Sequence, residues 1–301
     1  MIILNDSSSI KNALKNAKSG DTIFLKNGIY NEKIVINIDN ITLIGESTDK
    51  TIIRNNDYFH KILDDNNEAN TFRTYTCLVT GKNVKVSNLT IENTSLPSHK
   101  YGQAVALHAC GDEFLCENVC LKSAQDTLFT GPLQKDLIER YTGFLKPDQL
   151  IPSPTKQVYK NCKIYGDTDF IFGSSQALFI DSDIISIGNG YVCAPAHAKE
   201  MEYGYLFYNC NIISTTDCNV YLGRPWRDYG CAAFINCKIG KHIDPKGFNK
   251  WDNTNRDKTA RFYEYTKNID LSKREKWINE LSETDAKNYV DSFFKYINYK
   301  E

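Results

Sequence analysis

The chain has 301 residues, of which 41% are hydrophobic and 24% charged, as in ordinary soluble globular proteins. A formal net charge of −1 provides no general attraction for nucleic acid or for an anionic membrane, so neither is expected as a partner. No stretch of the sequence approaches the roughly 18 uninterrupted apolar residues that a membrane-spanning helix needs.

The N-terminal segment lacks the basic stretch and apolar core of a signal peptide. We therefore expect a cytoplasmic location for the chain as written, or a secreted protein if a leader has been trimmed. Within this segment, SSIKNALKNAKSGD predicts a short capping helix that ends at Gly20.

Ten cysteines leave three alternatives, namely buried free thiols, disulfides or a metal site. Cys162, Cys210 and Cys237 each follow an Asn inside a short apolar run, where cysteine behaves as a small hydrophobic residue. No CxxC pair occurs, which makes a zinc site the least favoured alternative. Buried free thiols are favoured, and they also fit a cytoplasmic location.

Short apolar runs recur through the middle of the chain, mostly around an Asn. They are IDNITLIG at Asn40, VSNLTIEN at Asn88, CENVCLKS at Asn118, YKNCKIYG at Asn161, FIDSDIIS at Ser182, FYNCNIIS at Asn209 and FINCKIGK at Asn236. From position 161 onward the steps are 21, 27 and 27 residues, the size of one coil of a parallel β-solenoid. An antiparallel sandwich also contains many short strands, but it does not require the same polar residue in every unit.

Two segments depart from this repeat. Residues 131–156 form a polar, proline-bearing insertion that we expect to border a cleft. Residues 270–301 predict a helical cap, in which Ser282 is the N-cap and the apolar side chains of Tyr289, Phe293 and Tyr296 cover the last coil. The charged run at 272–276 is expected on a solvated helix face. We expect one domain over 1–301.

Four polar residues lie at matching places in their repeats. Counted from the Asn of its own repeat, Asp126 and Asp169 each lie 8 residues downstream, and Gln103 and Arg224 each lie 15. Equal spacing predicts that the two carboxylates lie side by side on neighbouring coils. Less firmly, it also predicts that the amide and the guanidinium share their face.

Aromatic and apolar residues surround these carboxylates, as in the run DFIFG that follows Thr168. Burial and a neighbouring carboxylate raise the pKa of one acid, while Arg224 is expected to keep the other ionised. Such a split gives a site one acid and one base or nucleophile, and Trp226 adds a platform for stacking a sugar. A purely structural ion-pair network is the alternative that spacing alone leaves open.

Four motifs in order, YGQAVAL, SAQDTLF, GDTDFIFG and YLGRPW, resemble the pectin methylesterase (pectinesterase) family. TFRTYT, GFNKW and FYEYTKN also fit, so that the resemblance covers nearly the whole chain. It implies an all-β fold, a single-stranded right-handed parallel β-helix like that of pectin lyase. It also implies a carbohydrate esterase that releases methanol from methylated galacturonan polymer or oligosaccharides.

Catalytic roles follow from the resemblance, position by position. Asp169 would be the nucleophile, and Asp126 the general acid and then the base. Gln125 and Gln103 would stabilise the oxyanion, and Arg224 would orient the nucleophile.

The resemblance also implies a set of substrate contacts and needs no metal or organic cofactor. The contacts come from Thr71, Gln103, Phe172, Arg224 and Trp226, and from Phe129, which stands where a Tyr is common. An enzyme that trims imported oligogalacturonides would reconcile a cytoplasmic location with this substrate.

Two rival functions stay open at this point. One is a lyase or glycosidase on the same fold, and the other is a sugar-binding β-helix without activity. The Gln-Asp and Asp-Arg pattern, with its two oxyanion amides, favours acyl transfer over a lyase or glycosidase. The presence of all five candidate catalytic residues argues against an inactive sugar-binding module. The sequence does not reveal the oligomeric state.

Overall fold

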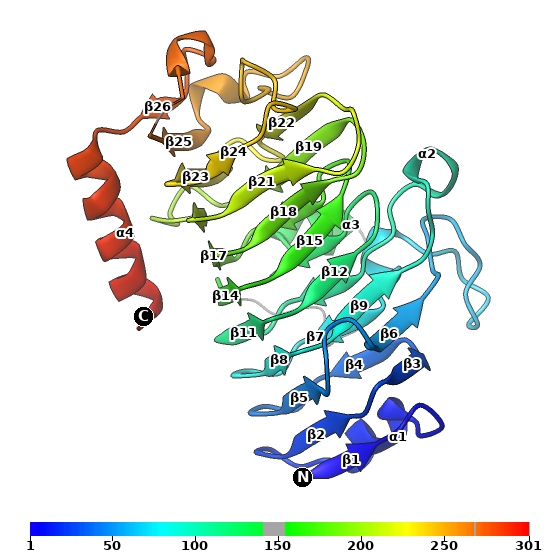
Figure 1. Cartoon of the computed structure of the whole chain (residues 1–301). Helices are drawn as coiled ribbons and strands as arrows, with labels where there is room; N and C mark the ends of the chain where they lie inside the picture. Colours follow the sequence, from blue (N-terminus) through cyan, green and yellow to red (C-terminus); the bar gives the residue numbers. More distant parts are fainter. Residues whose placement is uncertain (141–153, 268, 301) are drawn as a thin grey trace.

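The computed structural model describes residues 1–140, 154–267 and 269–300. Over these ranges the chain winds into a solenoid whose coils stack from the N-terminus toward β26 (Figure 1). The strand pairs within its three sheets are parallel. The prediction of a parallel β-helix is confirmed.

Most coils contribute one strand to each of three sheets, here named A, B and C. Sheet A contains β1 (Ile2–Leu4), β2 (Thr22–Leu25), β5 (Thr42–Gly45), β8 (Lys85–Ser87), β11 (Phe114–Glu117), β14 (Lys156–Lys160), β17 (Gln176–Ile180), β20 (Tyr205–Tyr208), β23 (Cys231–Ile235), β25 (Arg261–Tyr265) and β26 (Asn279–Glu280). Sheet B contains β3 (Gly28–Asn31), β6 (Thr51–Asn55), β9 (Thr90–Asn93), β12 (Cys120–Lys122), β15 (Lys163–Gly166), β18 (Asp183–Ser186), β21 (Asn211–Ser214) and β24 (Lys238–Ile239). Sheet C contains β4 (Ile34–Ile36), β7 (Cys77–Val79), β10 (Leu107–Ala109), β13 (Leu128–Thr130), β16 (Ile171–Gly173), β19 (Gly190–Pro195) and β22 (Val220–Gly223).

The interior of the solenoid is filled by side chains in register from coil to coil. In sheet A, Tyr159, Phe179, Phe207 and Phe234 are partners in the ladder, and their rings stack at centroid distances of 4.8, 4.6 and 4.4 Å. All four side chains are fully buried. One coil cannot bury such a side by itself, so the stacking of coils creates the core.

Five of the recurring Asn residues form the turn between sheets A and B, in the left-handed backbone conformation. The φ angles are 56° at Asn88, 54° at Asn118, 52° at Asn161, 54° at Asn209 and 55° at Asn236. Asn40, with φ of 60°, lies instead between β4 of sheet C and β5 of sheet A, where its side-chain oxygen accepts from Asn83 Nδ2 at 2.8 Å, so its assignment to the same place in the repeat is wrong. Asn is among the few residues that tolerate this region. In the remaining repeat the turn residue is Asp181, with φ of 51°, and not Ser182 as expected from the sequence. Ser182 is buried and accepts a hydrogen bond from the Cys162 N–H at 3.0 Å.

All ten cysteines lie in the described ranges and are free thiols, and nine of them are buried. Burial alone raises the pKa of the Cys77 thiol to about 12. These cysteines act as small apolar residues of the core, as the favoured interpretation of the sequence held.

Helix α1 (Ile10–Asn16) begins at the N-cap Ser9 and buries Ile10 and Leu14 at the first coils. It ends before Gly20, whose φ of 91° places it in the following turn. The predicted capping helix therefore exists but is shorter than expected.

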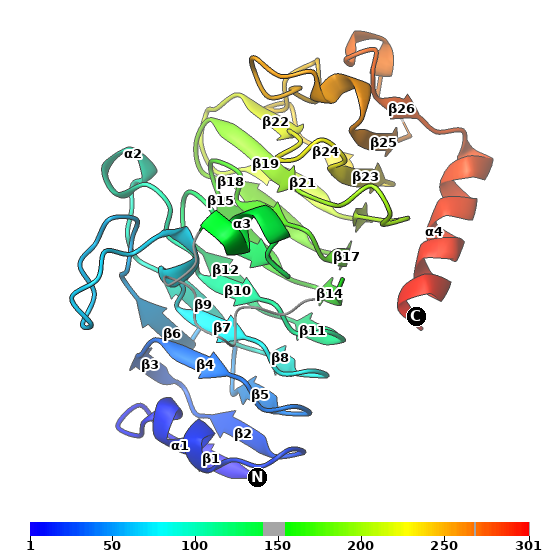
Figure 2. The ribbon, with the colours of Figure 1, turned by 180° about the vertical axis from the view of Figure 1, so that it is seen from behind.

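Helix α4 (Glu283–Ile297) begins at the predicted N-cap, where the Ser282 side chain accepts from the Asp285 N–H. It buries Ala286, Val290, Phe293 and Ile297 against the outer face of β17, β20 and β23. The helix runs along the side of sheet A (Figures 1 and 2), so the expectation that it covers the last coil is wrong.

The charged run at 272–276 is also different from the prediction. It lies in and after the short 3-10 turn η4 (Leu271–Lys273), and Arg274 points inward with 7% of its surface exposed. Its guanidinium donates to both oxygens of the fully buried Glu264, at 2.8 and 2.9 Å. A buried carboxylate requires such a partner, and this pair closes the last coil. None of the helices in the described ranges combines the length and apolar character that a bilayer crossing requires.

Candidate active site

Asp126 and Asp169 occupy equivalent places on adjacent coils. β13 pairs with β16 so that Leu128 is opposite Ile171. Asp126 lies two residues before Leu128, and Asp169 lies two residues before Ile171. The Asp126 N–H donates to the Thr168 carbonyl at 3.1 Å, which ties the two turns together. The equal spacing counted in the sequence therefore corresponds to equal position in the structure. Both aspartates have left-handed backbone, with φ of 65° and 50°.

Arg224 reaches Asp169 from two coils further along the solenoid. It follows β22, and its Nε and Nη2 donate to Oδ1 and Oδ2 of Asp169 at 2.9 and 2.6 Å. The guanidinium lies between two aromatic rings, 3.8 Å from the Tyr191 centroid and 3.9 Å from that of Trp251. A planar cation clamped in this way has little freedom to leave the carboxylate.

Gln103 and Gln125 lie on the two coils before Asp169. They form an isolated parallel bridge, and the Ala104 N–H donates to the Gln125 carbonyl at 3.1 Å. Both side chains line the same cleft as the aspartates. Arg224 follows Gly223, which is in register with Ile171 and Leu107 through the intervening strands. Gln103 precedes Leu107 by four residues, so the expected equivalence of Gln103 and Arg224 is wrong, although they share a cleft.

These residues surround a cleft of about 290 Å³ on the sheet C side of the solenoid. Its lining residues are Thr71, Phe72, Gln103, Gln125, Asp126, Leu137, Arg140, Asp169, Phe172, Ala194, Arg224, Trp226 and Trp251. Phe129, which the resemblance implied as a substrate contact, is not among them. It is fully buried beneath the cleft, with its ring 5.2 Å from Phe72 and 5.0 Å from Phe172.

Residues 5–135 and 141–297 match the family model described as Pectinesterase. The chain belongs to the pectinesterase family. It is 31% identical over 294 residues to "Probable pectinesterase 8" of Arabidopsis thaliana, covering 91% of this chain and 67% of that protein.

Solved pectin methylesterases share the fold. The enzyme titled "Pectin methylesterase from Carrot" superposes with a TM-score of 0.81 at 22% identity, covering 99% of this chain and 93% of that one. A pectin methylesterase in complex with a hexasaccharide superposes with a TM-score of 0.76 at 24% identity, covering 97% and 96%. The chain spans 41% to 69% of the length of four plant relatives.

The two aspartates of the cleft differ in acidity. Burial raises the pKa of Asp126 well above its ordinary range, and the charge of Asp169 raises it further. Burial also raises the pKa of Asp169, but the hydrogen bonds and charge of Arg224 oppose that rise. Asp126 therefore holds a proton more strongly than Asp169, as expected for an acid beside an ionised partner.

The insertion contributes to one edge of the cleft through α3 (Lys135–Arg140). Leu137 and Arg140 of this helix line the cleft, and Asp136 accepts from Arg227 Nη2 at 2.7 Å. The start of the insertion thus borders the cleft as expected, and its residues 141–153 lie outside the described ranges.

Several cleft residues were not singled out from the sequence. Trp251 belongs to the GFNKW motif, whose family match was the available signal. Phe72 stands next to Thr71 in the TFRTYT motif, so the family match was a signal for this residue as well. Leu137 and Arg140 carried no signal, because they come from the insertion. Across the described residues, no group of three or more His, Cys, Asp or Glu side chains is placed to hold a metal ion.

Proposed function

We propose that this chain hydrolyses the methyl esters of methylated galacturonan and releases methanol. The observation that carries the proposal is the in-register pair of buried aspartates, of which Arg224 grips only one. A site with one ionised and one protonated carboxyl group has both a nucleophile and a general acid.

In the first half of the proposed reaction, a carboxylate oxygen of Asp169 attacks the ester carbonyl carbon. The carbonyl oxygen becomes an oxyanion, and we assign its stabilisation to the side-chain N–H groups of Gln103 and Gln125, which line the cleft. The bond to the methoxy group then breaks, and Asp126 gives its proton to the departing methanol. The product is a mixed anhydride between Asp169 and the sugar carboxyl group.

In the second half, Asp126 is a carboxylate and accepts a proton from water as the water attacks the anhydride. Collapse of the second oxyanion releases the free galacturonate and returns Asp169 to its ionised form. Arg224 donates two hydrogen bonds to Asp169, and so we assign it the orientation of the nucleophile.

Sugar binding is assigned to the aromatic and polar walls of the cleft. Trp226 and Phe172 lie edge to face, with ring centroids 5.7 Å apart, and both border the cleft, as does Thr71. The relative solved with a hexasaccharide supports an oligosaccharide or polymer as the ligand. The comparisons give no support to a cytoplasmic location, and we propose the secreted alternative because it fits a polymeric cell-wall substrate.

The test is methanol release from methylated galacturonan polymer and oligomers, with chain length followed in the same samples. We expect methanol with unchanged chain length, and loss of release in Asp169→Asn and Asp126→Asn variants that keep the wild-type thermal unfolding transition. New reducing ends or unsaturated products would show a glycosidase or lyase instead. Sugar binding without methanol from the wild-type protein would leave a binding module.

A further inference from the structure

A long loop between β6 and β7, residues 56–76, forms the wall of the cleft on the side of the early coils. Thr71 and Phe72 of this loop line the cleft, at the start of the 3-10 turn η1 (Thr71–Arg73). Phe59 of the same loop donates its N–H to the Gln103 carbonyl at 2.9 Å. The 56–76 loop therefore contacts both a substrate-facing wall and the backbone of a proposed oxyanion residue.

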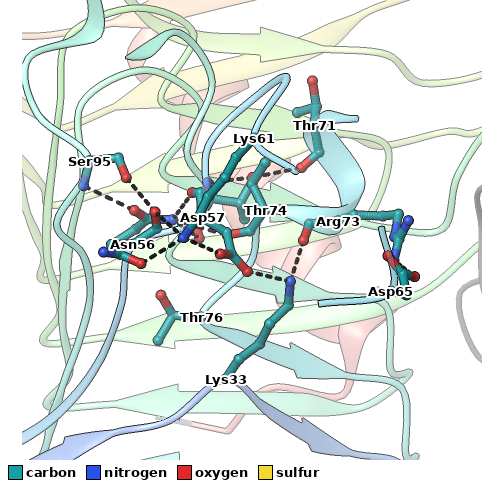
Figure 3. Close-up of polar contacts among 12 residues, drawn as sticks. Lys33, Asn56, Asp57, Lys61, Asp65, Thr71, Arg73, Thr74, Thr76 and Ser95 are labelled. Carbon is teal, nitrogen blue, oxygen red and sulfur yellow. Dashed lines mark hydrogen bonds and ion pairs between the residues drawn. The ribbon is translucent and has the colours of Figure 1, made fainter. Parts of the chain in front are cut away.

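Asp57 is the centre of the polar contacts within this loop (Figure 3). Its two carboxylate oxygens each accept from one ammonium, Oδ2 from Lys33 and Oδ1 from Lys61, both at 2.8 Å. The side chain of Asp57 is 12% exposed, so neither contact is an ordinary surface pair. Burial raises the pKa of Asp57, but the two lysines outweigh it and the pKa is lowered, which keeps the carboxylate ionised.

The same two ammonium groups also donate hydrogen bonds to other residues of the loop. Lys33 also donates to the carbonyl of Arg73, the last residue of η1, and Lys61 donates to the Asn56 side-chain oxygen at 2.8 Å. The Lys33 ammonium lies 4.5 Å from the centroid of the Tyr75 ring. Asp57 thus links the first residues of the loop to its last turn.

Asn93 joins this network to the segment before β10 that carries Gln103. Its fully buried amide donates to the carbonyls of Asp57 at 2.8 Å, Thr74 at 3.0 Å and Val105 at 3.2 Å. The Thr74 hydroxyl in turn accepts from the Val105 N–H at 3.0 Å. Val105 lies two residues after Gln103, so movement of the loop is coupled to the position of that glutamine.

We propose that Asp57 is a positioning residue, which holds the 56–76 loop so that Gln103 and Thr71 are correctly placed along the cleft. This inference rests on the proposed esterase function, because it is measured through that reaction. Asp57 contacts neither substrate nor the reacting carboxylates, and it acts through the loop.

The primary test is Asp57→Asn, which keeps the shape of the side chain and removes the charge that two ammonium groups share. The matched control is Glu92→Gln, which removes a partly buried carboxylate that pairs with Arg54 between the neighbouring strands β6 and β9. We expect kcat for methanol release to fall about 10- to 100-fold in Asp57→Asn, the loss that displacement of a reacting group by about 1 Å produces. Glu92→Gln should stay within about twofold of the wild type, measured below both unfolding temperatures.

A double-mutant cycle distinguishes positioning from general destabilisation. If Asp57 acts through Gln103, adding Asp57→Asn to the Gln103→Ala variant should change little. The kcat of the double variant should lie within about twofold of that of Gln103→Ala alone. The milder Lys61→Gln, which leaves Lys33 on Asp57, should lower kcat in the same direction and by less, and it serves where Asp57→Asn does not fold.

Two results would overturn the inference. One is a wild-type kcat in Asp57→Asn, or in Lys61→Gln if that is the folded variant. The other is a double variant whose losses multiply. If the wild-type protein itself releases no methanol, the proposed function fails. That result is distinguishable from failure of the role assigned to Asp57, which requires an active wild-type protein.

Discussion

Substitution of Arg224 by Lys tests the electrostatic asymmetry on which the proposed reaction depends. Arg224 donates two hydrogen bonds to the two oxygens of Asp169, at 2.9 and 2.6 Å, and the compact ammonium of Lys has no fork that reproduces both. Hydrogen bonds to charged groups contribute about 1.5–3 kcal/mol each. Loss of one bond to the ionised form of Asp169 corresponds to a pKa increase of about 1–2 units, since one unit equals about 1.4 kcal/mol.

The assay is the pH dependence of kcat/KM for methanol release. Asp169 must be ionised to attack, so its higher pKa in Arg224→Lys should move the acid limb of the profile upward by about 1–2 pH units. Arg227→Lys is the control, because Arg227 borders the same region but pairs with Asp136 and stacks on Trp226. An acid limb that stays at the wild-type pH in Arg224→Lys would refute the assigned role of this arginine.

Three further predictions concern acidity and stability. Because Asp167 raises the pKa of Asp126, Asp167→Asn should move the alkaline limb of the same profile to lower pH, and an unmoved limb would contradict this electrostatic account. Glu264→Gln leaves the buried Arg274 without its anion, so urea unfolding should show a loss of about 3–5 kcal/mol, and a change below about 1 kcal/mol would be inconsistent with a buried pair. Ser282→Ala removes the N-cap of α4 and should cost about 1 kcal/mol in the same measurement, whereas an unchanged midpoint would mean that the cap adds nothing.

The sequence predicts the fold well where the repeat has a physical cause. Asn recurs because the turn between sheets A and B needs a left-handed backbone, and that need is local enough to be visible residue by residue. The same requirement explains why the predicted turn residue Ser182 was wrong by one position. Asp also tolerates the left-handed conformation, and Asp181 occupies the turn in that repeat. Equal spacing from these turns predicted the adjacent aspartates correctly. The segments from Asn118 to Asp126 and from Asn161 to Asp169 have the same length, and the strands within them pair in register.

The sequence predicts less where a position depends on packing between distant segments. A helical pattern shows which face of residues 283–297 is apolar, but not that the face covers sheet A. Likewise, the run at 272–276 shows charge, and only the fold reveals that Arg274 is opposite Glu264. Phe129 follows the same rule, since a motif places it beside the catalytic segment but cannot show that it is beneath the cleft floor.

The parallel β-helix explains why the difference between the two carboxyl groups comes from other side chains. The main-chain ladder places Asp126 and Asp169 one coil apart, at a separation of about 4.8 Å between strands, and equivalent backbone gives both the same approach to the cleft. By symmetry of position alone they would share burial and repulsion equally. Arg224 removes this equivalence because it comes from two coils further on and reaches only the nearer carboxylate. In the proposed reaction, the direction of the solenoid therefore determines which aspartate attacks, and we expect an arginine introduced on the other side of the pair to exchange their roles.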